Sequence, residues 1–275
     1  MTEVEVNATA YTPDSFRRRI PVVGAFHDTI AVTRRNLISL TRNPRFFVFT
    51  MVQPVIFVIL FRYVFGGALS STLGGVPYVN YLMPGIFVQT VTFGAITTGI
   101  SMAMDVQSGV LERFRSLPMA RSGVLNGRTT ADLLRNILVI ILISGVGFAV
   151  GFRVETNYAL FLCALLLVLF WAYALSWVFA LVGLALKDPE TAQAASFPII
   201  APLVFASSAF VPVSTMPSWL QGFATYQPVS VTVSAARALC LGGPTASFLL
   251  QSLAWCAGII LVCAPLSVRV YKRSV

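Results

Sequence analysis

Residues 158–186 read YALFLCALLLVLFWAYALSWVFALVGLAL and contain no Lys, Arg, Asp, Glu or His. A helix needs about 20 apolar residues to cross the roughly 30 Å hydrocarbon core of a bilayer, so this stretch can span a membrane. The whole chain is similar in character: 57% of its 275 residues are hydrophobic and 11% are charged, against about 25% charged residues in an average soluble domain. The composition therefore excludes a soluble, disordered or fibrous protein.

Six stretches of this kind predict an all-α integral membrane protein with six transmembrane helices. The predicted spans are about 46–65, 84–104, 133–152, 158–186, 192–210 and 248–270. We expect residues 1–20 to be a flexible cytoplasmic N-terminus and residues 21–275 to form one transmembrane domain. The first 45 residues hold no apolar run of signal-peptide length, so a cleaved secretory signal is not expected.

The positions of the basic residues predict the orientation of the spans, because Lys and Arg are held on the cytoplasmic side. All but three of the 19 Lys and Arg fall in the N-terminal segment, the connections after the second and fourth spans, or the C-terminal tail. The connection after the second span is assigned Arg113, Arg115, Arg121, Arg128 and Arg135. Both termini are therefore predicted to be cytoplasmic, in a multi-pass protein of the plasma membrane. Attraction to anionic lipid explains the net charge of +9, and no nucleic acid partner is expected.

Residues 21–43 predict an amphipathic helix that lies in the plane of the membrane surface. Its apolar side chains recur every three or four residues, while several arginines occupy its other faces. Such basic amphipathic helices bind at the interface between lipid and water. The apolar positions are Val23, Phe26, Ile30, Leu37 and Leu40.

The cytoplasmic connection after the second span predicts a short amphipathic helix. Val110, Phe114 and Leu117 recur at helical spacing between charges of both signs, and Pro118 ends the helix. A surface linker needs no apolar stripe. The pattern therefore favours a docking element.

Residues 211–246 predict two short helices that dip into the outer leaflet and return. Trp219 and Phe223 lie one helical turn apart, followed by Tyr226 and Pro228. Aromatic residues of this kind favour the membrane interface. The segments between prolines are too short to cross the bilayer.

Carboxylate, imidazole and amine side chains are absent from the predicted spans. All acidic residues, the single His and both Lys fall outside them, whereas ion-driven carriers need ionisable groups within the bilayer. The chain has no phosphate-binding loop and no arrangement of nucleophile and base. Its four Cys form no CxxC pair, so no metal site is indicated. We expect no catalytic residue and no bound cofactor, and any energy must come from a partner.

Small residues predict where the spans pack closely. Ala95, Gly99 and Ala103 share one helix face, and Gly147 and Gly151 are also four residues apart. The fifth span carries Pro198 and Pro202, which permit a kink. It is a candidate moving or cavity-lining helix.

Four motifs occur in order along most of the chain. They are Tyr81-Leu-Met-Pro-Gly85, Val110-Leu-Glu-Arg-Phe-Arg-Ser-Leu-Pro118 with Arg121 and Gly127, Met216-Pro-Ser-Trp-Leu220, and Gln227-Pro-Val-Ser230 with Ala236-Arg237. With them the sequence resembles the permease subunits of type-2 ABC exporters, in particular the daunorubicin/doxorubicin-resistance permeases of actinobacteria.

The resemblance implies six spans, an N-terminal interfacial helix, a cytoplasmic coupling helix and re-entrant helices before the last span. It also implies a second permease chain, identical or different, and separate ABC ATPase subunits that bind ATP and Mg. The residues that would contact the ATPase are Leu111, Glu112, Arg113, Phe114, Arg115, Leu117 and Pro118. The implied path lies between spans one, two and five, at Phe57, Phe61, Arg62, Gln89, Phe93, Thr97, Pro198, Pro202, Phe205 and Phe210. The outer re-entrant region would hold Trp219, Phe223, Tyr226 and Pro228.

The function expected from these features is export of a hydrophobic or amphipathic molecule, a drug or a lipid. The implied path is rich in Phe, Thr and small residues, and the interior of the predicted spans is poor in Lys and Arg. Two alternatives stay open: a membrane scaffold or immunity protein that does not transport, and a polysaccharide-exporting permease of the same fold. Arg62 either reaches the lipid headgroups or contacts an anionic lipid-like substrate.

Overall fold

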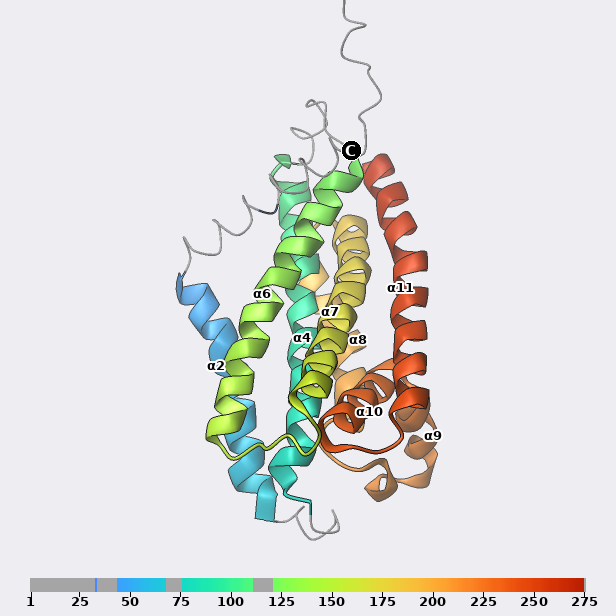
Figure 1. The fold of residues 1–275 in the computed structure, drawn as a ribbon. Helices are drawn as coiled ribbons and strands as arrows, with labels where there is room; N and C mark the ends of the chain where they lie inside the picture. Colours follow the sequence, from blue (N-terminus) through green and yellow to red (C-terminus); the bar gives the residue numbers. More distant parts are fainter. Residues whose placement is uncertain (1–32, 34–43, 68–75, 111–120, 275) are drawn as a thin grey trace, which may run out of the picture.

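The computed structural model describes residue 33 and residues 44–67, 76–110 and 121–274, which form helices joined by short connections without any strand (Figure 1). The prediction of an all-α protein is confirmed for these residues. The helices are α2 (Pro44–Leu60), continued by the π-helix η2 (Phe61–Phe65), then α4 (Tyr78–Gln107), α6 (Arg121–Ala149), α7 (Tyr158–Leu186), α8 (Pro189–Phe205), the 3₁₀ turn η3 (Val213–Thr215), α9 (Ser218–Tyr226), α10 (Pro228–Leu241) and α11 (Thr245–Ser274).

Four helices are long and apolar enough to cross a membrane, and they coincide with predicted spans two, three, four and six. They are α4, α6 from Leu125, α7 and α11 up to Tyr271. Predicted span one corresponds to α2 and η2, and span five to α8, which has 17 residues. The chain is thus a multi-pass membrane protein. The predicted N-terminus, the coupling segment at 111–118 and all of the interfacial helix except Thr33 lie outside the described residues.

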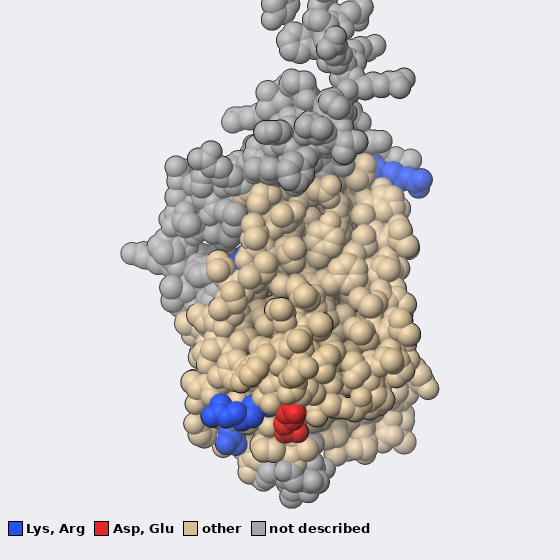
Figure 2. All heavy atoms as spheres, in the orientation of Figure 1, with Lys and Arg blue, Asp and Glu red and all other residues tan. Residues whose placement is uncertain are grey.

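The long helices run side by side between two ends of a bundle (Figure 1). One end carries the C-terminus and the 187–188 connection between α7 and α8. The opposite end carries the 150–157 connection, α9 and α10. On the face shown in Figure 2, the coloured charged side chains lie mainly toward the two ends and the middle is almost free of them, as expected for a surface that faces lipid.

Helix α7 has clear start and stop signals. The side chain of Asn157 accepts a hydrogen bond from the Leu160 amide at 2.8 Å, which caps its first turn. At the other end Lys187 adopts a left-handed conformation with φ of 60°. Asp188 then caps α8 by accepting hydrogen bonds from the amide and the hydroxyl of Thr191 at 2.7 and 2.6 Å. Pro189 follows at a position where helices tolerate proline.

The centre of the bundle is the contact between α4 and α7. Trp171 of α7 is 2% exposed, and its indole N–H donates to the hydroxyl of Thr92 in α4 at 2.9 Å. Thr92 in turn donates to the Val88 carbonyl at 2.7 Å. These bonds satisfy the polar atoms that an apolar interior would otherwise leave unpaired.

Two glycines allow α4 and α7 to approach closely. A Cβ on Gly183 of α7 would overlap the carbonyl of Gly99 in α4, and one on Gly99 would lie 3.0 Å from the Phe179 carbonyl oxygen. The predicted packing face of α4 is therefore confirmed, since Ala95 and Ala103 on it are also buried.

The second predicted pair of glycines is only half correct. Gly147 of α6 packs against the side chain of Met83 in α4, where a Cβ would overlap the methyl group. Gly151 is not a packing residue, because it lies beyond the end of α6 with φ of 104° and would meet nothing within 4 Å. Its role is to let the chain turn after the helix.

Candidate functional site

A groove of about 1030 Å³ runs between α2, α4 and α8. Its α4 wall follows one helix face, on which Phe93, Ile96, Thr97, Ile100, Ser101 and Met104 recur at three- and four-residue spacing. The α8 wall follows the same rule from Glu190 to Phe205. Helix α2 contributes Gln53 and Phe57. These three helices correspond to predicted spans one, two and five.

Aromatic rings form a continuous row that starts in this groove and extends beyond it to η2. We use the name aromatic row for Phe65, Phe61, Phe210, Phe205, Phe93 and Phe197, whose successive ring centres are 4.5 to 6.3 Å apart. Phe57 joins the row by its contacts with Phe61 and Phe210. Phe197 and Phe205 are 57% and 50% exposed. The row therefore offers an accessible surface that suits flat apolar molecules.

The structure brings most of the predicted path residues together. Phe57, Phe93, Thr97, Pro198 and Phe205 line the groove, and Phe61 and Phe210 extend the aromatic row. Gln89 lines a neighbouring pocket, whereas Arg62 and Pro202 line neither of these two cavities.

Arg62 lies in the π-helical turn η2, and its Nε atom has no hydrogen-bond partner.

Four polar groove residues, Gln53, Ser101, Glu190 and Gln193, were not predicted. In α8 the spacing of the residues could have indicated two of the polar groove residues, because Glu190 and Gln193 share one helix face with Phe197. Gln53 is the one polar residue in the apolar stretch 51–61, next to Pro54.

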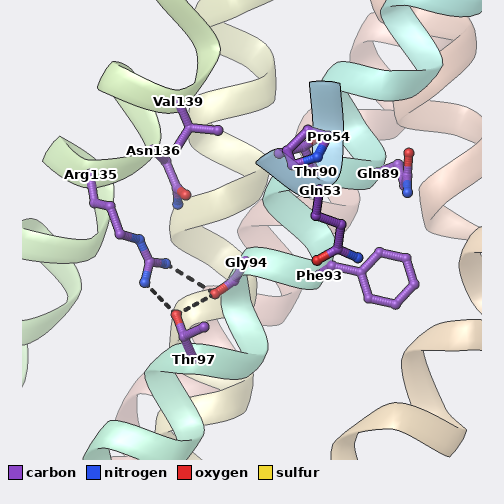
Figure 3. A pocket seen from close by; sticks show the side chains of 10 residues that line it. All are labelled: Gln53, Pro54, Gln89, Thr90, Phe93, Gly94, Thr97, Arg135, Asn136 and Val139. Carbon is purple, nitrogen blue, oxygen red and sulfur yellow. Dashed lines mark hydrogen bonds between the residues drawn. The ribbon is translucent and has the colours of Figure 1, made fainter. Parts of the chain in front are cut away.

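A smaller pocket of about 170 Å³ lies between α2, α4 and α6 (Figure 3). It shares Gln53, Phe93 and Thr97 with the groove, so the two cavities are neighbours. Its remaining lining residues are Pro54, Gln89, Thr90, Gly94, Arg135, Asn136 and Val139. Most of these side chains are polar, in contrast to the aromatic row.

Arg135 is placed differently from the prediction. The sequence assigned it to the cytoplasmic connection, but it lies well inside α6 and is 4% exposed. Its guanidinium donates to the Thr97 hydroxyl and, at 3.0 Å, to the Gly94 carbonyl, which lies in the middle of α4 (Figure 3). The assignment of Arg135 to the cytoplasmic connection is therefore wrong, because it lies within a helix that is long and apolar enough to span the membrane.

A carboxylate accompanies this arginine. Asp132, which was predicted to lie before the third span, is 7% exposed within α6. One of its oxygens lies 3.7 Å from Arg135 Nη1, and the other has no hydrogen-bond partner. The buried cation is thus partly compensated by a charge one helical turn away.

Two amides beside Arg135 carry unpaired atoms. Gln89 and Asn136 are both 3% exposed, yet Gln89 Oε1 and Asn136 Nδ2 have no hydrogen-bond partner. A buried polar group without a partner costs about 1–3 kcal/mol. The pocket therefore keeps unused hydrogen-bonding capacity deep within the bundle.

At the opposite end from the C-terminus, the first and the last of the four sequence motifs converge on residues 206–210. Arg237 Nη2 and the Tyr81 hydroxyl both donate to the Ser208 carbonyl, at 2.8 and 3.3 Å. The Gln227 amide donates to the Ala206 carbonyl at 2.8 Å. Ser230 Oγ accepts a hydrogen bond from the Ser208 amide at 3.0 Å. We call this arrangement the outer junction, since it joins the ends of α4, α8 and α10.

The predicted C-terminal end of span five is wrong, because the chain turns into the outer junction before residue 210. The span was expected to continue to Phe210, but α8 ends at Phe205. Ser207 donates to the Val204 carbonyl, and the backbone then turns toward α4 and α10. Gly85 makes this approach possible, because a Cβ there would overlap the backbone of Ala209.

Helix α9 carries the predicted exposed aromatics. Trp219 is 80%, Phe223 47% and Tyr226 75% exposed, all on a helix of nine residues. Pro228 opens α10. A helix of nine residues is too short to cross a bilayer.

The ends of α4 and α6 flank the predicted coupling segment. Arg128 of α6 forms an ion pair with Asp105 of α4 at 3.1 Å. The two helices are thereby fixed to each other at the end of the bundle that carries the C-terminus (Figure 1). Any force on the segment that joins them would reach α4 and α6 directly.

Comparison with known proteins supports the sequence resemblance. Residues 27–241 match the ABC-2 type transporter family. The chain is 33% identical, over 81% of its length and 78% of the relative's, to the daunorubicin resistance ABC transporter permease protein DrrB1 of Streptomyces coeruleorubidus. It is 29% identical, over 86% of both chains, to the probable doxorubicin resistance ABC transporter permease protein DrrC of Mycobacterium tuberculosis. A putative transport permease, ycf38, of Cyanophora paradoxa is 25% identical over 77% of this chain.

The matched residues include α2, α4 and α8, which form the groove, and α10, which completes the outer junction. The chain therefore belongs to the ABC-2 type transporter family.

Proposed function

We propose that this chain is the permease subunit of an ATP-driven exporter that moves a hydrophobic or amphipathic molecule out of the cytoplasm or the inner leaflet. The observation that supports this most directly is the accessible aromatic row along a groove between α2, α4 and α8. Large apolar surfaces that are open on an isolated chain mark binding sites for ligands, lipids or partner proteins. In an ABC-2 transporter, such a groove suits a transported apolar molecule.

The functional unit in this proposal contains two permease chains and separate ATPase subunits that hold ATP and Mg. The exposed faces of α2 and α8, with Ile56 at 52% and Ile199 at 52% exposure, suit the second permease chain. The segment 111–118 would contact the ATPase, and Leu111, Glu112, Arg113, Phe114, Arg115, Leu117 and Pro118 would make that contact.

In the membrane, we propose six spans with both termini on the cytoplasmic side of the plasma membrane. Helices α2 with η2 and α8 would be the two shorter spans. Helices α9 and α10 would then lie in the outer leaflet without crossing it. The exposed aromatics of α9 support this position, since Trp and Tyr favour the interface.

The decisive experiment is transport into vesicles that contain the chain with or without its cognate ABC ATPase. Doxorubicin serves as a fluorescent probe because relatives are named for resistance to it. Accumulation that requires ATP and the ATPase would support the proposal. Movement down a gradient without ATP would overturn it, and assembly with the ATPase without any transport would favour a scaffold.

Variants of the coupling segment provide a second test of the same proposal. Glu112→Ala and Phe114→Ala should keep ATPase binding but reduce transport per ATP hydrolysed. Gln107→Ala, an exposed residue at the end of α4, is the matched control. Unchanged coupling in both variants would contradict the assignment of this segment.

A further inference from the structure

The polar pocket beside the groove has a composition that the aromatic row does not explain. Six of its ten lining residues have polar or charged side chains, namely Gln53, Gln89, Thr90, Thr97, Arg135 and Asn136. Gln89, Arg135 and Asn136 are buried, Thr90 and Thr97 are partly buried, and Gln53 is exposed. A buried ionisable residue within a membrane domain marks a functional site by default.

The unused hydrogen-bonding capacity of the pocket is of both kinds, because Gln89 Oε1 is an unpaired acceptor. A guanidinium has five N–H groups, and Arg135 uses two hydrogen bonds to reach Thr97 and the Gly94 carbonyl. Asn136 Nδ2 adds an unpaired donor, and Figure 3 shows its side chain extending from α6 toward α4. A ligand hydroxyl would accept from Asn136 Nδ2 and donate to Gln89 Oε1, whereas a carbonyl or ether oxygen would pair the donor alone.

The net charge around the pocket is close to neutral. Asp132 Oδ1 lies 3.7 Å from Arg135 Nη1 and offsets much of its positive charge. A fully anionic ligand would meet this carboxylate, and a cationic ligand would meet the guanidinium. An uncharged ligand with carbonyl, hydroxyl or ether oxygens meets neither repulsion.

The space for such a group depends on the missing side chain of Gly94. A Cβ at Gly94 would lie 3.4 Å from Asn136 Oδ1 and 3.8 Å from Arg135 Nη2. These are ordinary contact distances, so a methyl group would fit without displacing the fold. It would occupy the room between the two polar side chains.

We propose that Arg135, Asn136 and Gln89 form a subsite that binds the uncharged, oxygen-bearing end of the transported molecule, while its apolar body lies on the aromatic row. The shared lining residues Gln53, Phe93 and Thr97 connect the two parts. This inference rests on the proposed function and specifies its substrate class: an amphiphile with a flat apolar body and a neutral oxygen-bearing end.

The test uses four probes with one aromatic body: butylpyrene, pyrenebutanol, pyrenebutyrate and pyrenebutylammonium. Binding to the permease with its ATPase in lipid nanodiscs is measured by energy transfer from tryptophan to pyrene. We expect the wild type to bind pyrenebutanol at least about tenfold more tightly than the other three. A preference under about threefold, or a preference for the anion or the cation, would overturn the subsite.

Variants of the pocket residues test whether the preference for pyrenebutanol arises in this pocket. Gly94→Ala and Asn136→Ala should each weaken pyrenebutanol binding by about tenfold and change butylpyrene binding by less than about twofold. Gly145→Ala is the matched control, because a Cβ there in α6 would meet nothing within 4 Å. Equal losses for all probes, or no loss for pyrenebutanol, would overturn the proposal.

A transport assay distinguishes failure of the proposed subsite from failure of the proposed exporter function, on which the subsite rests. If ATP-dependent export of doxorubicin persists while the variants keep the wild-type preference, the subsite fails and the exporter stands. If the wild type shows no ATP-dependent export, the proposed function fails, whatever the pyrene probes show.

Discussion

The guanidinium of Arg237 lies 3.6 Å from the centre of the Tyr81 ring, and its Nε donates to the Tyr81 carbonyl at 3.1 Å. One residue of α10 thus holds both the side chain and the backbone of the same residue in α4. Because Arg237 also bonds the Ser208 carbonyl, it links three segments of the outer junction.

We predict that Arg237→Ala destabilises the protein by about 2–3 kcal/mol, because it removes charged hydrogen bonds to two carbonyls. Arg237→Lys should recover little, since a point-like ammonium does not reproduce the planar fork. Thermal unfolding in nanodiscs measures the effect. The exposed Arg153 at the same end is the control, and an Arg237→Ala melting temperature equal to that of Arg153→Ala would contradict the assignment.

Gly183→Ala should destabilise the contact between α4 and α7 by about 1–3 kcal/mol, because the new Cβ would overlap the Gly99 backbone. Gly85→Ala should act similarly at Ala209. Denaturation of the purified protein gives the comparison with Gly145→Ala, which has open space around it. Similar losses in all three variants would mean that close packing is not the cause.

Lys187→Gly should stabilise the protein by about 1 kcal/mol, because a residue with a Cβ in the left-handed region is strained by roughly 1–2 kcal/mol. Lys187→Ala removes the charge but keeps the Cβ, so it should bring no such gain. Unfolding midpoints of the two variants decide the point. A gain of the same size in both would assign the effect to the charge.

The cap of α8 should depend on pH. Hydrogen bonds from Thr191 hold the pKa of Asp188 below its usual range. A pKa lowered by folding contributes stability above the unfolded value of about 3.9, and that stability is lost as the pH falls through the folded value. Hydrogen exchange in the first turn of α8, corrected for intrinsic rates, should therefore rise between pH 6 and pH 3. Asp188→Asn, which keeps a capping side chain, should remove this pH dependence; a dependence that persists would implicate another group.

Phe205→Ala should lower ATP-dependent export of doxorubicin by about tenfold, because it interrupts the aromatic row between Phe210 and Phe93. Its side chain is 50% exposed, so stability should change little. Leu261→Ala, at a 74% exposed position of α11, controls for loss of apolar surface elsewhere. Equal export by the two variants would count against the row as a transport surface.

The sequence predicted α7 from Tyr158 to Leu186, and the structure has the same limits. Its ends are local features, since Asn157 caps one and Lys187 and Asp188 separate the other from α8. By contrast, the end of α8 at Phe205 depends on partners far away in the chain, such as Gln227 and Arg237. Residues 206–210 are apolar enough to continue a span, so composition could not reveal the turn.

Arg135 shows the same limit for the candidate site. Because Arg135 lies near the end of a predicted span, the sequence placed it in the cytoplasmic connection. A buried cation needs hydrogen-bond acceptors around it, and a hydropathy pattern does not show whether such acceptors are present. Here the acceptors are the carbonyl of Gly94 and the hydroxyl of Thr97, both on another helix. Asp132 three residues earlier was the available local signal, since it forms an ion pair within one turn.

At the outer junction, the side chains of Tyr78, Tyr81, Gln227 and Arg237 all bond to carbonyl oxygens within residues 206–210. These four residues bind the main chain of the segment, through its carbonyl oxygens. The Tyr78 bond to the Phe210 carbonyl does not depend on the Phe210 side chain, but that side chain is 4% exposed and its ring packs against Phe61 in the aromatic row. The same ring therefore belongs to the core and to the aromatic row, so a smaller side chain at Phe210 would shorten the row and also leave a cavity beside the outer junction.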